Sequence, residues 1–173
     1  MQRFNIALIP VDENLQLLFQ SISQKYFGKH HDQYLLANGA LAHVTLCQFY
    51  AEDKDGALAA FQSFSAKKNI NITIRNYNIR SGRAPHIGFF WTEFVVDKTP
   101  TLLQMQAKCF SHLAAMGHES LTAIDTYAPH ITLARLGQHM EIRPSEDIPY
   151  GVPLAFRPVV GPSTENGVLQ NSF

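Results

Sequence analysis

The sequence predicts a single α+β domain over residues 1–173, built as two similar lobes, each an antiparallel sheet with helices outside, around a central cleft. The first observation behind this prediction is size, because 173 residues, 46% of them hydrophobic, suffice for one substantial core or two small packed lobes. The second is that strand-like and helix-like periodicities alternate along the chain. The third is a tetrapeptide, H-x-T-L, that stands at residues 43–46 and again at residues 130–133.

The first half of the chain is predicted to alternate strands and helices. An apolar run ends at Pro10, Asp12 can cap the start of a helix, and Gly28 can end it. In chain order, we expect a strand over residues 3–10, a helix over 12–28, a polar connection over 30–39, a strand over 41–50 and a helix over 53–68.

The second half repeats this pattern of strand, helix and motif-bearing strand. In chain order, we expect a strand over residues 70–80, a turn over 81–85, a strand over 86–96, a helix over 99–117 and a strand over 128–136. Prolines recur from residue 144 to residue 162, so long helices are excluded there and short edge strands are expected at 151–160 and 167–173. Each lobe therefore has one tetrapeptide on a strand, and the two strands are expected to face each other.

The composition excludes several classes of protein. The chain has 14 basic and 14 acidic residues, so no overall field attracts it to long nucleic acids or anionic membranes. No apolar segment has the length of a membrane span or of a signal peptide with its cleavage site, and we expect a cytoplasmic protein with no membrane partner. Cys47 and Cys109 are expected to be buried apolar residues, not a disulfide or zinc ligands.

Each tetrapeptide places an imidazole and a hydroxyl on the same side of its strand. Residues i and i+2 of an extended strand share a face, so His43 and Thr45 point one way, and His130 and Thr132 do the same in the second copy. The valine, isoleucine and leucines between and after them point to the other face, which is the core. One strand thus serves both a core and a site.

Two facing imidazoles can act as a general acid and a general base, because the ordinary pKa of histidine is about 6.5. The threonine hydroxyls can donate hydrogen bonds to the non-bridging oxygens of a phosphate. In a displacement at phosphorus, one imidazole would deprotonate the attacking water or hydroxyl and the other would protonate the departing oxygen. The residues leave open which histidine is the acid.

No metal ion or other cofactor is required by this chemistry. His30 and His31 suggest a metal site with His43, but no Asp, Glu or Cys stands at a recognisable ligand spacing. Adjacent histidines in a strand or loop also diverge. We therefore expect no metal and no cofactor.

These residues resemble the two-histidine (2H) phosphoesterases, whose defining feature is a pair of H-x-[ST]-x motifs. Residues 127–135, YAPHITLAR, are especially similar to the second motif of the RNA 2',3'-cyclic phosphodiesterase branch, also called the 2'-5' RNA ligase-like group. The opening residues 3–10 resemble that family's first strand. The resemblance implies a two-lobed α+β fold, His43 and His130 as the acid and base pair, and Thr45 and Thr132 as the phosphate-binding hydroxyls.

Two further residues are candidates for substrate binding. Tyr127 can stack on a nucleobase or hydrogen bond to the substrate, or it can be an ordinary aromatic residue at the entry to a strand. Arg135 lies five residues after His130, so strict alternation puts it on the face opposite His130 and Thr132. Only a twist or the end of the strand would bring Arg135 into the cleft.

The hairpin over residues 70–96 carries further polar and aromatic residues. Arg75, Arg80 and Arg83 can meet RNA phosphates, although an ordinary soluble surface is the favoured interpretation. For His86, a half-buried structural role is favoured over a place in the cleft. For the aromatic residues at 89–91, core packing is favoured over stacking on a base.

The resemblance implies metal-independent hydrolysis of a 2',3'-cyclic phosphate, or of a related 2'-linked phosphodiester, at RNA termini or in small cyclic nucleotides. The sequence indicates no obligate protein partner. One alternative is joining of RNA ends through a 2'-5' bond, because the same acid and base can act in the reverse direction. A second alternative is a non-catalytic module that binds RNA or nucleotides. Retention of both His-x-Thr pairs favours an enzyme, since binding alone needs no proton transfer.

Overall fold

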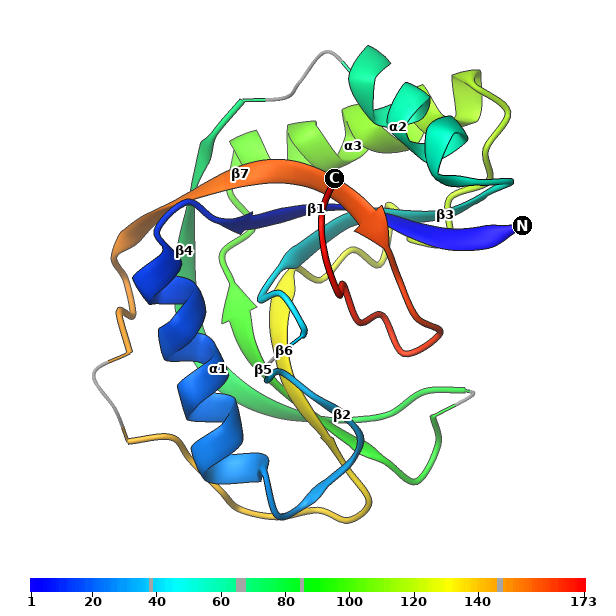
Figure 1. Cartoon of the computed structure of the whole chain (residues 1–173). Helices are drawn as coiled ribbons and strands as arrows, with labels where there is room; N and C mark the ends of the chain where they lie inside the picture. The colour runs from blue at the N-terminus through cyan, green and yellow to red at the C-terminus, as the bar shows by residue number, and fades with distance from the viewer. Residues whose placement is uncertain (38, 65–67, 85, 146–147) are drawn as a thin grey trace.

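The computed structural model describes residues 1–37, 39–64, 68–84, 86–145 and 148–173. Its described residues form an antiparallel sheet and three helices, which confirms the α+β class (Figure 1). The elements in chain order are β1 (Gln2–Pro10), α1 (Glu13–Phe27), β2 (His31–Leu35), β3 (Val44–Ala51), α2 (Lys54–Ser63), β4 (Ile70–Ser81), β5 (Phe90–Val96), α3 (Pro100–Ala115), β6 (His130–Leu136) and β7 (Pro153–Pro162).

The strands follow the order β2-β6-β5-β4-β7-β1-β3 in the described chain, and every neighbouring pair is antiparallel. β4 is the middle strand and joins the two halves of this series, since residues 70–73 pair with β7 and residues 74–81 pair with β5. The two halves are thus hydrogen bonded through one long strand. The division into two similar lobes stays a prediction.

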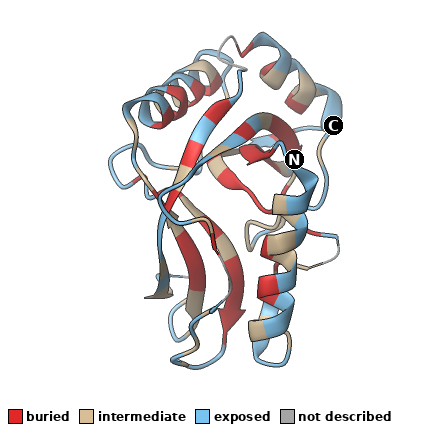
Figure 2. Cartoon of the chain, turned by 90° about the vertical axis from the view of Figure 1, so that its left-hand side faces the viewer, coloured by how far each residue is buried: buried red, intermediate tan, exposed pale blue. Residues whose placement is uncertain are grey.

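The helices cover the sheet from outside, with α1 packed on β6, β1 and β2, and with α2 and α3 on the end formed by β3 and β7 (Figure 1). Asp12 caps α1 through its side chain, as the sequence predicts, and Thr99 caps α3 in the same way, at the start of the helix expected over 99–117. Buried residues lie along the strands and on helix sides that face them (Figure 2). No helix in the described part of the chain is long and apolar enough to span a membrane.

Three boundaries differ from the predictions. The connection expected over residues 30–39 contains strand β2, which pairs with β6 and buries Tyr34. β2 lacks the apolar pattern of a strand, because it is an edge strand and most of its side chains are polar and exposed or partly exposed. The helix expected to reach residue 68 ends at Ser63, because the backbone at Phe64 is extended; residues 65–67 lie outside the described chain. The strand expected from residue 86 begins at Phe90, after a loop.

β7 lies inside the sheet, whereas an edge strand was expected over residues 151–160. Its prolines are compatible with this position because of the direction of its backbone groups. The amide of Ser163 donates to Arg3 on β1, whereas the carbonyl of Val160 accepts from Phe173 on the other side. Even-numbered residues of β7 therefore point away from β1, and the prolines at 158 and 162 remove no hydrogen bond to it. The strand expected at 167–173 is absent from the described chain, where Leu169 makes one isolated bridge.

The first H-x-T-L tetrapeptide ends in a β-bulge. On β3, Thr45 and Cys47 pair with consecutive residues of β1, so Leu46 has no partner across the pair. A bulge adds one residue to a strand and reverses the alternation of side chains beyond it. Gln48, three residues after Thr45, therefore lies on the same face as Thr45, and it pairs with Asn5.

The second tetrapeptide ends in a bulge at the same position. On β6, Thr132 and Ala134 pair with consecutive residues of β5, which leaves Leu133 without a partner. The side-chain alternation reverses here too, so Arg135 lies on the same face as Thr132 and pairs with Trp91. The expectation that Arg135 lies on the opposite face is wrong, because strict alternation does not hold across the bulge.

Hydrogen bonds from neighbouring elements stabilise the second bulge. The carbonyl of Leu133 accepts from the hydroxyl of Ser23 on α1, at 2.6 Å, and from the amide of Leu36, at 2.8 Å. The hydroxyl of Thr92 bonds both backbone groups of Ala134, at 3.0 and 3.2 Å. All backbone groups named here are thereby paired, which offsets the cost of interrupting a buried ladder.

Replacing Ser23 by Ala should therefore lower the free energy of unfolding by about 1–3 kcal/mol, because it leaves the buried carbonyl of Leu133 with one donor fewer. Urea denaturation followed by circular dichroism measures this change. The matched control is Ser21→Ala, an exposed position on the same helix, for which a change within about 0.5 kcal/mol is expected. Equal effects of the two substitutions would contradict the role of Ser23.

Candidate active site

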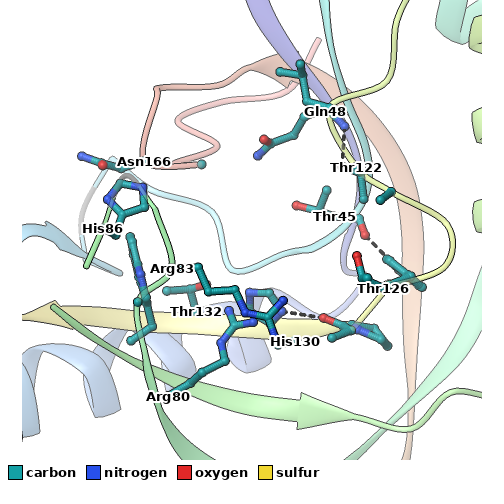
Figure 3. Close-up of a pocket in the computed structure, with 18 of the residues that line it drawn as sticks. Thr45, Gln48, Arg80, Arg83, His86, Thr122, Thr126, His130, Thr132 and Asn166 are labelled. Carbon is teal, nitrogen blue, oxygen red and sulfur yellow. Dashed lines mark hydrogen bonds between the residues drawn. The ribbon is translucent and has the colours of Figure 1, made fainter. Parts of the chain in front are cut away.

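A central cavity of about 380 Å³ brings both tetrapeptides together (Figure 3). His43, Thr45, His130 and Thr132 all line it. Its other walls come from the end of β4 and the loop after it, the segment before β6, and residues 165–167. The residues that sequence reasoning selected from two distant segments thus form one site.

The two imidazoles are held in the same way. The Nδ1 atom of His43 is 2.7 Å from the carbonyl oxygen of Leu41, and the Nδ1 atom of His130 is 2.7 Å from that of Ala128. A carbonyl oxygen only accepts hydrogen bonds, so each Nδ1 carries a proton and donates it. The Nε2 atom of each ring is left to exchange a proton with a ligand.

The surroundings of the two rings differ. His43 is 8% exposed, and its pKa is lowered from 6.5 to about 4. Burial is the main cause, and the neighbouring imidazole of His130 lowers the pKa further, against hydrogen bonds to the backbone of Leu41 and Gly167 that raise it. His43 is therefore neutral at pH 7. The side chain of His130 is 30% exposed.

Thr45 is oriented by groups on both sides of its strand. The amide nitrogen of the fully buried Asn5 donates to its hydroxyl oxygen at 2.9 Å. Because that oxygen already accepts a hydrogen bond, its own proton is available for an acceptor in the cavity. The hydroxyl of Tyr127 donates to the backbone carbonyl of Thr45 at 2.8 Å, which ties the segment before β6 to β3.

Charged side chains lie on the cavity face of β4 and β5. The Nη2 atom of Arg80 is 3.2 Å from Oε2 of Glu93, and the same oxygen is 3.8 Å from Nε2 of His130. Arg83 lines the cavity as well and, like Arg80, extends toward His130 (Figure 3). An anion in the cavity would meet two guanidinium groups as well as two hydroxyls.

Solved structures of phosphoesterases have this architecture. A crystal structure of a phosphoesterase superposes with a TM-score of 0.65 at 15% sequence identity, covering 99% of this chain and 95% of the other. E. coli LigT in complex with phosphate gives a TM-score of 0.60 at 15% identity, covering 99% and 94% of the two chains. E. coli LigT in complex with 3'-AMP gives 0.62 at 15% identity, covering 99% and 95%.

The chain has the fold of the 2H phosphoesterases. The resemblance that the two tetrapeptides indicate is thereby confirmed for the fold. No family model and no curated protein sequence matches the chain significantly. The structural likeness therefore extends over nearly the whole chain, at a sequence identity of 15%.

Tyr127 lines the cavity of this 2H phosphoesterase fold, but its hydroxyl is already engaged. The residue is 6% exposed, its hydroxyl donates to Thr45, and burial raises its pKa. These contacts assign Tyr127 a part in joining the two motif segments at the cavity wall. Its predicted role in binding substrate stays a prediction.

Arg135 lies behind the cavity wall and is not among the residues that line it. Its buried guanidinium forms an ion pair with Asp32 at 3.1 Å and bonds the ring of His86 and the side chain of Asn166, at 3.3 and 3.4 Å. It also stacks 4.3 Å from the ring centre of Phe89. Arg135 therefore ties Asp32 on β2 to the cavity residues His86 and Asn166. Direct contact with a substrate stays a prediction.

Several cavity residues were missed or judged differently from the sequence. His86 and Trp91 line the cavity and pack edge to face, with ring centres 5.3 Å apart, although a half-buried structural role was favoured for His86 and core packing for Trp91. Arg80 and Arg83 line it too, where an ordinary surface was favoured. The missed polar lining residues include Gln48, Thr122, Thr126 and Asn166. Only Gln48 had a signal in the sequence, because it follows His43 at the same spacing as Arg135 follows His130.

The buried cysteines and the remaining histidines stand apart from this site. Cys47 and Cys109 are buried and free, as expected. Within the described chain, no three His, Cys, Asp or Glu side chains are placed to hold a metal ion together. The chemistry available in the cavity is that of imidazoles, hydroxyls and guanidinium groups, with the exposed carboxylate of Glu165 at its edge.

Replacing Arg135 by Gln should lower the free energy of unfolding by about 2 kcal/mol, because it removes a buried guanidinium that pairs with the partly exposed Asp32 and leaves several acceptors without a donor. Guanidinium chloride denaturation measures the change. Arg157→Gln is the matched control, since Arg157 is an exposed strand residue, and its unfolding free energy should change by at most about 0.5 kcal/mol. An unchanged midpoint for the Arg135 variant would contradict this role.

Proposed function

We propose that this protein is a metal-independent phosphodiesterase that hydrolyses 2',3'-cyclic phosphates, or related 2'-linked phosphodiesters, at RNA termini or in small cyclic nucleotides. One observation carries the proposal: two imidazoles with matched Nδ1 anchors, and two threonine hydroxyls, line the same cavity. A binding site for phosphate needs the hydroxyls, but two groups that exchange protons are needed only for catalysis.

His43 is the general base in this proposal, and His130 is the general acid. His43 is neutral at pH 7, with a proton on Nδ1 and a lone pair on Nε2, as a base requires. A bond forms between the oxygen of a water molecule and phosphorus, while the water proton moves to Nε2 of His43. The bond from phosphorus to one ribose oxygen breaks, and that oxygen receives the proton from Nε2 of His130.

The hydroxyls of Thr45 and Thr132 stabilise the charge that develops on the non-bridging phosphate oxygens. The guanidinium groups of Arg80 and Arg83 add positive charge to the same cavity. Solved structures of E. coli LigT hold phosphate and 3'-AMP. These ligands support a site in this chain for a phosphate attached to a ribose.

Replacing either His43 or His130 by Ala should reduce hydrolysis of 2',3'-cyclic AMP by about 10²–10⁴-fold, because each substitution removes one proton-transfer group. Release of adenosine monophosphate, measured by chromatography in the presence of EDTA, tests this. His30→Ala, at an exposed histidine outside the cavity, should leave the rate unchanged.

Full activity of either alanine variant would overturn the proposed mechanism. The same assay with RNA carrying 2',3'-cyclic and 5'-hydroxyl ends separates hydrolysis from joining, because joining yields a longer product. Joined product in excess of hydrolysed product would assign ligation as the main activity. Binding of cyclic nucleotide without turnover would assign a non-catalytic role.

The pH profile of the rate constant kcat/KM should have its acid limb at an unusually low pH. His43 must be neutral to act as a base, and its pKa is about 4, so activity should persist below pH 6 and fall as the pH decreases through about 4. Folding imposes a linked requirement. The pKa of His43 is lower in the fold than in the unfolded chain, so stability also decreases as the pH falls from about 6.5 toward 4.

Initial rates on 2',3'-cyclic AMP between pH 3.5 and 9 test this, with circular dichroism at each pH to exclude unfolding as the cause of any loss. An acid limb centred at or above about pH 6.5, the ordinary pKa of histidine, would contradict the assignment of His43 as the base.

A further inference from the structure

An arginine, a glutamate and a histidine lie in a line across three adjacent strands. Arg80 lies on β4, Glu93 on β5 and His130 on β6, all on the same face of the sheet, and Arg80 and His130 line the central cavity. Glu93 is the middle member, and Arg80 and His130 are its diagonal neighbours on either side. One oxygen of Glu93, Oε2, lies 3.2 Å from Arg80 and 3.8 Å from Nε2 of His130.

Glu93 is an unusual residue for the centre of a sheet. Its side chain is 6% exposed, and a buried carboxylate is costly unless a positive charge compensates it. Among the described residues, no donor makes a hydrogen bond to its buried Oε2 atom. The contacts of that atom are the ion pair with Arg80 and the approach of His130. The oxygen is therefore available to a proton on Nε2 of His130.

Other titratable or charged groups share the cavity with His130. They are His43 before β3, Arg80 on β4, Arg83 and His86 in the loop after β4, Tyr127 before β6 and Glu165 near the C-terminus. The guanidinium groups and His43 disfavour a positive charge on His130. Glu165 is exposed, so solvent screens its charge. Glu93 is the buried anion next to the ring.

We propose that Glu93 is a positioning residue that keeps His130 in its imidazolium form and directs its Nε2 proton into the cavity, ready for the departing oxygen. Arg80 limits this effect, because its ion pair with Glu93 offsets part of the negative charge that acts on His130. The inference rests on the proposed function and deepens it, because it assigns the proposed acid, His130, a carboxylate close to its Nε2 atom. Two tetrapeptides of the same H-x-T-L pattern thereby receive opposite roles from the residue beside one of them.

The pair also fits the geometry of the reaction. The distance of 3.8 Å between Nε2 and Oε2 exceeds a hydrogen bond, so the carboxylate attracts the imidazolium without taking up its Nε2–H as a full hydrogen bond. The proton stays available for transfer to a ribose oxygen. After transfer, neutral His130 next to Glu93 regains a proton from solvent, which restores the acid for the next turnover.

The direct test is an NMR titration of the His130 ring in the wild-type protein and in Glu93→Gln, which keeps the size of the side chain and removes its charge. The signal is assigned by its absence from His130→Gln. The titration midpoint of His130 should fall by about one pH unit in Glu93→Gln, because an opposite charge within 4–6 Å has been removed while Arg80 remains. Glu52→Gln, at an exposed carboxylate outside the cavity, should leave the midpoint unchanged.

Arg80→Gln gives a prediction of the opposite sign. Without the guanidinium, Glu93 acts on His130 alone, and the midpoint should rise. The Arg80 side chain is 39% exposed, so this variant also keeps the test decisive if Glu93→Gln fails to fold. An unchanged midpoint in folded Glu93→Gln, or a fall in Arg80→Gln, would overturn the inference.

Kinetics then connect the titration to catalysis. For 2',3'-cyclic AMP at pH 7.5, kcat of Glu93→Gln should fall about tenfold or more with a smaller change in KM, and the alkaline limb of the kcat profile should move to lower pH. An equal loss at every pH would indicate a structural role and overturn the inference. The two proposals fail separately: an inactive wild-type enzyme overturns the proposed function, whereas an active enzyme with an unchanged His130 titration overturns only the role of Glu93.

Discussion

Two β-bulges, at Leu46 and Leu133, decide on which face of the sheet the side chains after each tetrapeptide lie. Both leucines are fully buried, so apolar packing holds the extra residue of each strand in place. Beyond each bulge the alternation is reversed, and each strand presents three polar side chains on the cavity face where strict alternation would present two. These are His43, Thr45 and Gln48 in the first half, and His130, Thr132 and Arg135 in the second.

The repeated backbone geometry gives two equivalent imidazoles, and their surroundings make them unequal. Each ring donates through Nδ1 to the carbonyl two residues before it, which leaves both Nε2 atoms free for chemistry. Burial keeps His43 neutral, while His130 is more exposed and lies beside a carboxylate on the neighbouring strand. The environment supplies the difference that an acid and base pair requires, although the motif itself is symmetric.

Local signals were sufficient where neighbours in sequence decide the structure. Asp12 caps its helix as predicted, and a strand lies where one was expected over residues 70–80, because these features depend on contacts within a few residues. The failures involve distant partners. β2 became a strand because β6 offers a pairing edge to a polar segment, and β7 entered the sheet because its prolines point away from β1.

The sequence by itself determined the α+β class, the strands that carry the two tetrapeptides, and the four side chains His43, Thr45, His130 and Thr132, because alternation along a strand is a local property. Only the tertiary structure decided what surrounds them. The register of β3 and β6 against their neighbours creates the bulges that turn Gln48 and Arg135 to the cavity face, and strand order brings Glu93 to His130. Register and strand order depend on contacts between residues far apart in the chain, which no local pattern encodes.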